Sequence, residues 1–365
     1  MTHHIMNRGP LIRDHELSRW VIKSPKTIRD VVEAINHGGS RTVFVVDDEN
    51  LLRASVSDGD VRRALLSGSG LDSPARCAFN DGFLSIVDDE LDTSPTSRVE
   101  ALRMGLTELP VVDSRGRIVC VEVLGDASPN TSRPNTVVIM AGGKGMRLRP
   151  LTELTPKPLI RVAGKPMLQH IIENLRGEGF SRIVVAVNYL ADQIEDYFAD
   201  GSRFGVNIEY VREDQPLGTA GALSLVTNVG VDPVVVMNAD LILAASIAKM
   251  VDYHTEKEAV ITVGAKLVEM TLPYGVLSVE GVTVERIDEK PERRDLVNAG
   301  VYVVSPAVVS AVARDQVLDM PELIDQYVAS GSVVAFPIHE AWADLGHPDE
   351  LRKAQAQMNF RGDPR

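Results

Sequence analysis

Short apolar runs recur along the chain from residue 137 onward and predict a buried β-sheet. β-branched residues dominate these runs, and consecutive apolar positions are typical of strands covered on both faces. We interpret five runs as strands: 137–140, 183–187, 234–237, 260–265 and 301–304. Pro166 suits the first turn of a helix, and one helical face then carries Met167, Leu168, Ile171, Ile172 and Leu175. Strands alternating with helices predict an α/β fold that binds ligands at the carboxyl ends of its strands.

Small polar residues and two prolines predict a boundary between two domains. Pro129 and Pro134 lie among Ser, Asn and Thr residues, and the apolar pattern restarts at Val137. A chain of 365 residues is also long for a single domain. We therefore predict a first domain over 1–126, a linker over 127–135 and a second domain over 136–365.

The first domain contains an internal repeat. Residues 41–60 and 108–123 each read as strand, acidic turn and strand, and each follows a predicted helix, 27–36 or 97–104. This α+β pair resembles tandem cystathionine β-synthase (CBS) modules, which regulate enzymes. The resemblance implies that Asp60, after Ser57, holds the ribose of an adenine nucleotide. A dimerisation platform without a ligand is the equal alternative, and the second copy lacks a clear counterpart of this motif.

Charge and composition narrow the classes of function. The net charge of −13 argues against a general nucleic-acid binder, whose surface would be basic, but leaves nucleotides open. The two cysteines, Cys77 and Cys120, form no C-x-x-C pair, so we expect a reduced, cytoplasmic setting without disulfides. No apolar run approaches a membrane span, and we expect no membrane partner.

A glycine-rich turn follows the first apolar run of the second domain. Ala141, Gly142, Gly143 and Gly145 expose backbone N–H groups that suit a polyphosphate, with positive charge from Arg147 and Lys157 on the same loop. The turn is not a Walker A loop, because no Lys-Ser/Thr pair opens a helix. Prolines at 150, 156 and 158 also forbid the helix that a dinucleotide fingerprint requires.

The glycines, the segment from Arg147 to Thr152 and the Pro-Lys-Pro-Leu at 156–159 resemble the signature of sugar-1-phosphate nucleotidyltransferases. The resemblance implies a Rossmann-like, glycosyltransferase-A-like fold with a mixed, mainly parallel sheet. It also implies that nucleotidyl transfer depends on Mg²⁺, with Asp240 and Asp344 as its ligands. Asp240 ends a buried run, and Asp344 lies in a Trp-x-Asp-x-Gly-x-Pro segment. In place of the family's glycine before the first aspartate stands Ala239.

The same resemblance assigns the two substrates to other segments. The nucleobase would lie against Gly218, Thr219 and Gly221, where small residues allow close approach to a flat heterocycle. The sugar phosphate would lie across two further segments and one asparagine, with Lys290 neutralising its phosphate: the residues are Tyr274, Gly275, Glu289, Lys290 and Asn298.

We therefore predict an enzyme that transfers a nucleotidyl group from an NTP to a sugar 1-phosphate. The pairing with CBS modules resembles guanylyltransferases of bacterial surface-sugar pathways, including those that make GDP-glucosamine for legionaminic acid, which favours GTP and a homo-oligomer. Another base (dTTP, UTP or CTP) is one alternative. A metal-dependent glycosyltransferase and a catalytically silent, nucleotide-sensing subunit are the others.

Overall fold

The computed structural model describes residues 10–38, 42–88, 98, 101, 106, 108–124 and 132–359. The chain divides into two compact units, Met1–Ser128 (unit 1) and Pro129–Arg365 (unit 2). Each unit has its own buried clusters of apolar side chains. No helix among the described residues combines the length and apolar character needed to cross a bilayer.

Unit 1 repeats one topology in two small sheets. In the first sheet β2 pairs in parallel with β3, which pairs antiparallel with β4, and in the second β5, β6 and β7 do the same. The predicted repeat is thus visible as a repeated topology, whereas most of the predicted helix 97–104 lies outside the described residues. The elements are β1 (Leu11–Ile12), α1 (Asp14–Leu17), β2 (Val21–Lys23), α2 (Ile28–Gly38), β3 (Thr42–Val46), β4 (Leu52–Ser57), α3 (Asp58–Leu66), β5 (Ile86–Val87), β6 (Glu108–Val112) and β7 (Ile118–Val123).

Unit 2 is built on a seven-stranded sheet with the order β12-β11-β8-β13-β18-β15-β19. Only β18 runs antiparallel to its neighbours, so the predicted mixed, mainly parallel α/β fold is confirmed. The strands of this sheet are β8 (Arg133–Met140), β11 (Phe180–Val187), β12 (Asn207–Arg212), β13 (Val234–Asn238), β15 (Ile261–Thr271), β18 (Glu292–Val304) and β19 (Val333–Ile338).

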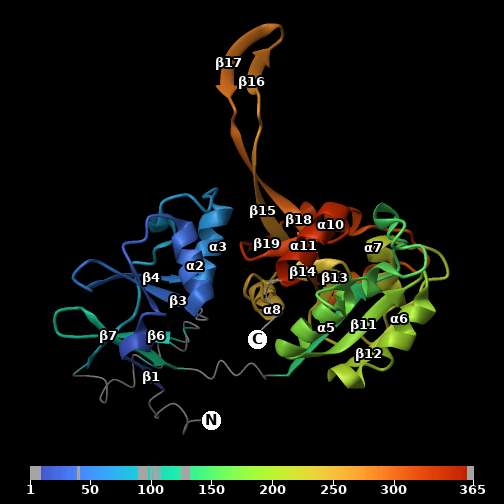
Figure 1. Cartoon of the computed structure of the whole chain (residues 1–365), viewed down its shortest axis with the longest axis horizontal. Coiled ribbons are helices and arrows are strands. Elements are labelled where there is room, and N and C mark those ends of the chain that lie inside the picture. The colour runs from blue at the N-terminus through green and yellow to red at the C-terminus, as the bar shows by residue number, and fades with distance from the viewer. Residues whose placement is uncertain are drawn as a thin grey trace. The chain divides into compact units, whose positions relative to one another are not determined.

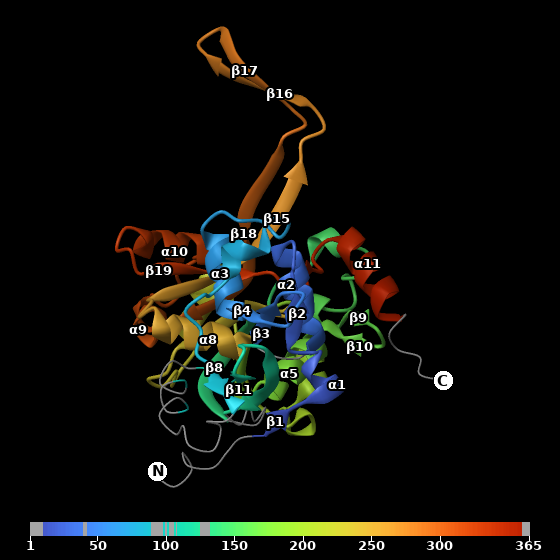
Figure 2. The same ribbon diagram turned by 90° about the vertical axis from the view of Figure 1, so that its left-hand side faces the viewer.

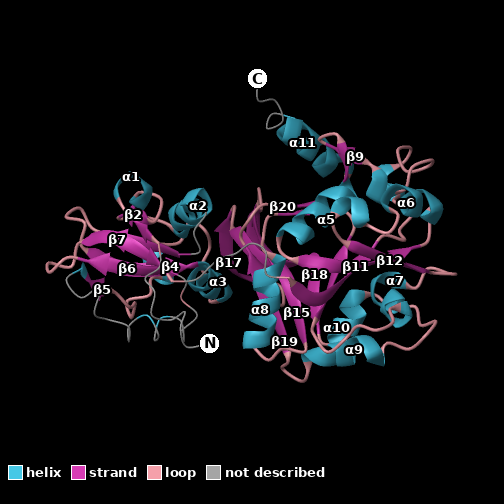
Figure 3. Cartoon of the chain, turned by 90° about the horizontal axis from the view of Figure 1, so that it is seen from below, coloured by secondary structure: helices cyan, strands magenta, loops and turns pink. Residues whose placement is uncertain are grey.

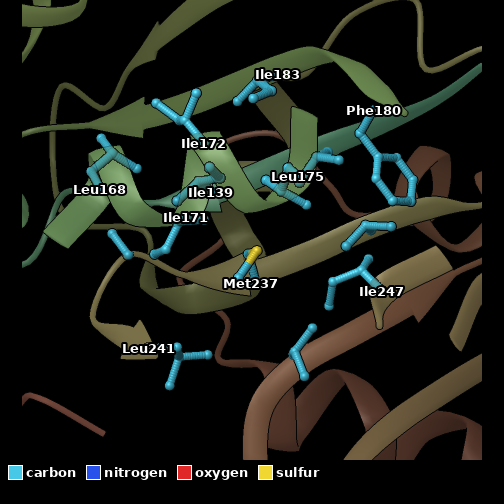
Figure 4. Close-up of a cluster of buried hydrophobic side chains, with 14 of the residues drawn as sticks. Ile139, Leu168, Ile171, Ile172, Leu175, Phe180, Ile183, Met237, Leu241 and Ile247 are labelled. Carbon is cyan, nitrogen blue, oxygen red and sulfur yellow. The ribbon is translucent and has the colours of Figure 1, made fainter. Parts of the chain in front are cut away.

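Helices cover both faces of this sheet (Figure 3). Side chains of α5, α6 and α8 pack on one face, part of which Figure 4 shows around Ile139 and Met237. Side chains of α7, α9 and α10 pack on the other face. The helices are α5 (Met167–Gly177), α6 (Ala191–Phe198), α7 (Gly218–Gly221), α8 (Ile247–Glu256), α9 (Pro306–Ala311), α10 (Met320–Val328) and α11 (Pro348–Asn359).

Three pairs of strands lie outside the large sheet. They are β9 (Arg161–Val162) with β10 (Lys165–Pro166), β14 (Leu241–Leu243) with β20 (Trp342–Asp344), and β16 (Gly275–Glu280) with β17 (Thr283–Glu289). The β16–β17 hairpin stands clear of the rest of unit 2 in two perpendicular views (Figures 1 and 2). The outer halves of β15 and β18 carry it, and they pair only with each other beyond the end of β19.

Three predicted boundaries differ from the structure. The linker was predicted to extend to Asn135, but β8 begins at Arg133, because Arg133 forms an ion pair with Asp252 and Asn135 donates a hydrogen bond to the Pro233 carbonyl. Residues 127–131 of that linker lie outside the described residues. The strands predicted at 260–265 and 301–304 are much longer than their apolar runs, since their outer halves mix charged with apolar residues and are partly or fully exposed.

Candidate active site

A cleft of about 270 Å³ opens at the carboxyl ends of β8 and β13 in unit 2. Its position is where open α/β sheets bind their ligands. The described residues that line it come from the glycine turn, the Lys157 segment, the loop before α7 and the turn after β13: Met140, Ala141, Gly142, Gly143, Lys157, Pro158, Glu213, Pro216, Gly218, Thr219, Asn238, Ala239 and Asp240.

The glycine turn has the shape that the prolines predict. Ala141 donates a backbone hydrogen bond to Ala186, and the chain then leaves the sheet. A single 3₁₀ turn, Met146–Leu148, follows in place of an α-helix. The Thr152 hydroxyl closes the loop by donating to the Gly145 carbonyl at 2.8 Å. Three of the four predicted phosphate-binding residues of this turn line the cleft, and the fourth, Gly145, lies against the side chains of Thr152 and Lys157.

Two carboxylates lie beside this turn, at the ends of the paired strands β14 and β20. Asp240 precedes β14 and Asp344 ends β20, and the register pairs Asp344 with Leu241. The Asp240 carbonyl also accepts a hydrogen bond from Leu345 N at 2.9 Å. Lys157 contacts the Asp240 carboxylate, and both side chains are about six-sevenths buried, at 14% and 15% exposure. The pairing of β14 with β20 therefore joins two residues that are far apart in sequence.

Gly346 marks the point where the charged groups meet. A Cβ added there would lie 2.8 Å from Arg147 Nη2, from Lys157 Nζ and from Asp344 Oδ1. Only a residue without a side chain leaves this space to the three groups, and Asp344 Oδ1 accepts the Gly346 N–H at 2.7 Å. The structure thus brings together the four residues that the sequence assigned to catalysis.

The donor set at this point fits Mg²⁺. Asp240 and Asp344 supply carboxylate oxygens, which are hard ligands of the kind that Mg²⁺ prefers alongside phosphate oxygens. Arg147 and Lys157 lie beside them and can neutralise the remaining phosphate charge. A site of this composition can hold a metal and a polyphosphate together.

Two residues of the site were missed by the sequence analysis. His347 Nε2 accepts a hydrogen bond from Arg147 Nη1 at 2.6 Å. Glu213 lines the cleft, its Oε2 accepts the Leu217 N–H at 2.8 Å, and burial raises the pKa of its carboxyl. The available signal was position: Glu213 follows the end of β12, as Asp240 follows β13.

The predicted base-binding segment lies at the cleft, but its glycines have another reason. A Cβ on Gly218 would lie 2.6 Å from the Leu318 carbonyl oxygen, and one on Gly221 would lie 2.3 Å from that of Gln316. These glycines therefore admit the chain's own backbone. Gly218 lines the cleft and Gly221 does not, so the role of Gly221 at the base stays a prediction. Thr219 also contacts this part of the backbone's surroundings: its N–H donates to Asp319 Oδ1, one residue after Leu318, at 2.9 Å.

Four of the five residues predicted to bind the sugar phosphate lie away from the cleft. Tyr274, Gly275, Glu289 and Lys290 form the base of the β16–β17 hairpin, and none of them lines the cleft. The fifth, Asn298, accepts the Gly300 N–H at 2.9 Å. Gly300 in turn lies against Asn238, which lines the cleft. The structure brings the catalytic group together and leaves this second group on the hairpin.

In unit 1, Ser57 and Asp60 cap helix α3. Asp60 Oδ2 accepts from the Ser57 N–H at 2.8 Å and from the Ser57 hydroxyl at 2.6 Å, while Arg63 donates to Oδ1 at 2.9 Å. The Asp60 side chain is 6% exposed. In this structure its carboxylate already has partners on both oxygens, which is the role of a capping box.

Known proteins resemble the chain over unit 2. The nucleotidyl transferase family matches residues 136–360. A mannose-1-phosphate guanyltransferase of Yarrowia lipolytica is 35% identical over 222 residues, covering 59% of this chain and 61% of the relative. A mannose-1-phosphate guanylyltransferase of Mycobacterium tuberculosis is 30% identical over 230 residues, covering 60% of this chain and 64% of that protein. The chain thus spans somewhat over three fifths of the length of these relatives.

A solved structure agrees with the fold. It is described as a glucose-1-phosphate thymidylyltransferase of Bacillus anthracis in complex with a sucrose, and it superimposes with a TM-score of 0.52 at 25% identity. The match covers 63% of this chain and 97% of the other. Because the family match extends over more than half of its residues, and the cleft has the charged groups described above, the chain belongs to the nucleotidyl transferase family.

Proposed function

We propose that the protein is a Mg²⁺-dependent sugar-1-phosphate guanylyltransferase, which converts GTP and a sugar 1-phosphate into a GDP-sugar and pyrophosphate. The observation that carries the proposal is the gathering of Arg147, Lys157 and Asp344 around Gly346, next to Asp240 and the glycine turn. The names of the relatives, mannose-1-phosphate guanylyltransferases, point to the same reaction.

The proposed reaction is a direct displacement at the α-phosphorus. A phosphate oxygen of the sugar phosphate attacks in line, and pyrophosphate leaves with the electron pair of the broken P–O bond. Asp240 and Asp344 would hold Mg²⁺, which on binding draws negative charge from the phosphate oxygens. Lys157 and Arg147 would orient the triphosphate and stabilise its charge, and the backbone N–H groups of Gly142 and Gly143 would bind its oxygens. No protein nucleophile is needed.

Glu213 supports guanine as the base. An ionised carboxylate only accepts hydrogen bonds, and the Watson–Crick edge of guanine presents two neighbouring donors, N1–H and N2–H₂. Glu213 lines the cleft together with Gly218 and Thr219, which were assigned to the base. The other bases present an acceptor or a single donor at that place. The alternative, a nucleotidyltransferase for another base, is favoured by the likeness to the thymidylyltransferase structure.

The co-substrate that we propose is a hexose, amino-hexose or N-acetyl-hexosamine 1-phosphate, for bacterial surface-glycan or nonulosonate synthesis in the cytoplasm.

For unit 1 we propose a CBS-like regulatory pair that binds an adenine nucleotide. The repeated topology of β2–β3–β4 and β5–β6–β7 supports this proposal. The capped state of Asp60 favours the competing interpretation, a dimerisation platform without a ligand.

Pyrophosphate release tests the enzymatic proposal. Purified protein would be assayed with Mg²⁺, each of GTP, UTP, dTTP, CTP and ATP, and a panel of hexose and hexosamine 1-phosphates. We expect release with GTP and one class of sugar phosphate. A strong preference for another base would reject the guanylyl assignment. A separate reaction would supply an NDP-sugar, and release of NDP from it without pyrophosphate would identify a glycosyltransferase. Inactivity with every substrate would favour a silent nucleotide-sensing subunit.

A further inference from the structure

Residues 266–297 form an extension of the large sheet that we call the arm. It consists of the outer halves of β15 and β18 and of the β16–β17 hairpin. The pairing runs continuously from Ala265 with Asn298 to Thr271 with Glu292. At about 3.3 Å per residue, this ladder holds the hairpin roughly 20 Å beyond the sheet. Figures 1 and 2 show the arm free of the rest of unit 2 along this length.

One face of the hairpin is apolar. The register places Leu277 opposite Ile287 and Val279 opposite Val284, so the four side chains share a face. They are 53%, 63%, 58% and 48% exposed, respectively. The other face is polar and includes Ser278 opposite Arg286. An isolated two-stranded ribbon is marginally stable in water, and a contiguous apolar face of this kind marks an interaction surface.

The base of the hairpin places one residue in an unusual backbone conformation. Lys290 has a φ of +48°, which is unusual for a lysine, and its N–H donates to the Tyr274 carbonyl at 3.2 Å. Residues kept in this strained region cluster at ligand-binding sites. None of the described residues forms an ion pair with Lys290. Beside it, the Gly275–Glu289 pair lies on the same face as the apolar side chains.

The lining of the cleft is short of positive charge, and the arm carries Lys290. Lys157 is the one cation among the described residues that line it, and Lys157 already contacts Asp240. Arg147, beside Gly346, and Lys157 are assigned to the triphosphate together with Mg²⁺, whereas no further cation among the described lining residues is left for the sugar phosphate. No described residue of the arm lines the cleft of its own chain. The paired strands of the arm lead away from the sheet. A second copy of the chain has the same cleft and the same need.

We propose that the arm crosses to a second copy of this chain, covers its apolar face there, and delivers Glu289 and Lys290 to the sugar-phosphate end of the partner's cleft. The proposal rests on the proposed function for the role of these two residues. Exchange of identical elements between two copies is a common route to symmetric dimers. Each active site then contains the cations of one chain and the sugar-phosphate residues of the other.

Subunit complementation tests the exchange. Lys157→Ala disables the cleft and Lys290→Ala disables the arm, so each homo-oligomer should lose turnover. When both variants, carrying different tags, are co-expressed and the mixed dimer is purified through both tags, one of its two sites contains neither substitution. We expect about one half of the wild-type rate per dimer. If the arm acts within its own chain, every site keeps one defect, and the absence of any recovery overturns the proposal.

A second experiment keeps the test independent of catalysis. Leu277→Ser with Ile287→Ser should convert the dimer to a monomer in light scattering and abolish turnover while binding of a non-hydrolysable GTP analogue remains. The matched control on the opposite face, Ser278→Ala with Arg286→Ala, should leave the dimer intact. If the wild type is inactive with every substrate, the proposed function fails, yet loss of the dimer would still support the docking of the arm. A wild type that is monomeric would refute it.

Discussion

Arg147 and His347 are joined by a hydrogen bond of 2.6 Å between Nη1 and Nε2, although 200 positions separate them in the chain. This contact ties the glycine-turn loop to the segment after β20, the strand that ends in Asp344. The guanidinium is thereby held beside Gly346, in the space where the charged groups meet. Only the neutral imidazole nitrogen can accept this bond.

Removal of this acceptor should weaken catalysis. We expect His347→Ala to lower kcat/KM for the nucleotide about tenfold, the loss of one hydrogen bond to a charged group. His347→Gln keeps an acceptor and should retain most of the activity. Steady-state pyrophosphate release measures both variants, with His37→Ala, an exposed histidine of unit 1, as the control. Equal rates for His347→Ala and wild type would show that Arg147 needs no such support.

Lys157 should be indispensable for turnover. Its ammonium contacts Asp240 in a largely buried site, where a fixed charge stabilises a transition state most effectively. We expect Lys157→Ala to lower kcat by about 10²- to 10³-fold. Lys165→Ala, which removes an exposed lysine paired with Glu173, is the matched control and should be near wild type. Unchanged turnover in Lys157→Ala would contradict the proposed mechanism.

Glu213 should determine the base. Replacement by Gln exchanges a pure acceptor for a group that also donates, so Glu213→Gln should lower the ratio of kcat/KM for GTP to that for UTP by about 10- to 100-fold. The ratio comes from competition between the two nucleotides in one reaction. Asp214→Asn, at the neighbouring position that does not line the cleft, should keep the wild-type preference.

The same carboxyl predicts a dependence on pH. Burial raises the pKa of Glu213 above that of an ordinary glutamate. As the pH falls, this group therefore takes up a proton before an ordinary glutamate does, and its protonated oxygen then no longer accepts a hydrogen bond from guanine. We expect the KM for GTP to rise on the acid side in the wild type and to stay flatter in Glu213→Gln. Parallel profiles would separate Glu213 from base recognition.

Asp60 should matter for the stability of unit 1 with or without a nucleotide. Loss of the capping box in Asp60→Ala should lower the free energy of unfolding by about 1 kcal/mol, as measured by urea denaturation. For regulation, ATP, ADP and AMP would be titrated against wild type and Asp60→Asn. Identical thermal shifts in the two proteins would discard the ribose contact and leave Asp60 a purely structural residue.

The buried strands could be predicted from the sequence because all of their side chains lie in the same apolar environment. Strands such as β8 and β13 are covered on both faces and therefore consist of consecutive apolar residues. The outer half of β18 has no such pattern, since Arg293 and Arg294 face water and pair only with β15. Its strand conformation depends on the partner strand, which composition does not reveal.

The residues of the site likewise include some that the sequence could predict and some that it could not. Asp240 and the glycine turn could be predicted because a strand end and a motif mark them, and Asp344 because its segment resembles the family's. His347 could not, because its role depends on the pairing of β14 with β20 and on the path of the Arg147 loop. The order of Tyr274 and Lys290 along the chain likewise contains no information on how far the arm leads them from the cleft.

The antiparallel strand β18 occupies the middle of the large sheet, between β13 and β15, although it is made after both. Until residues 292–304 leave the ribosome, β13 and β15 each present an open edge to other chains. We therefore expect fragments that stop before residue 292 to aggregate. A protein cut at the tip of the arm, near Gly281, should by contrast reassemble from its two pieces, because the late piece brings the strand that both edges lack.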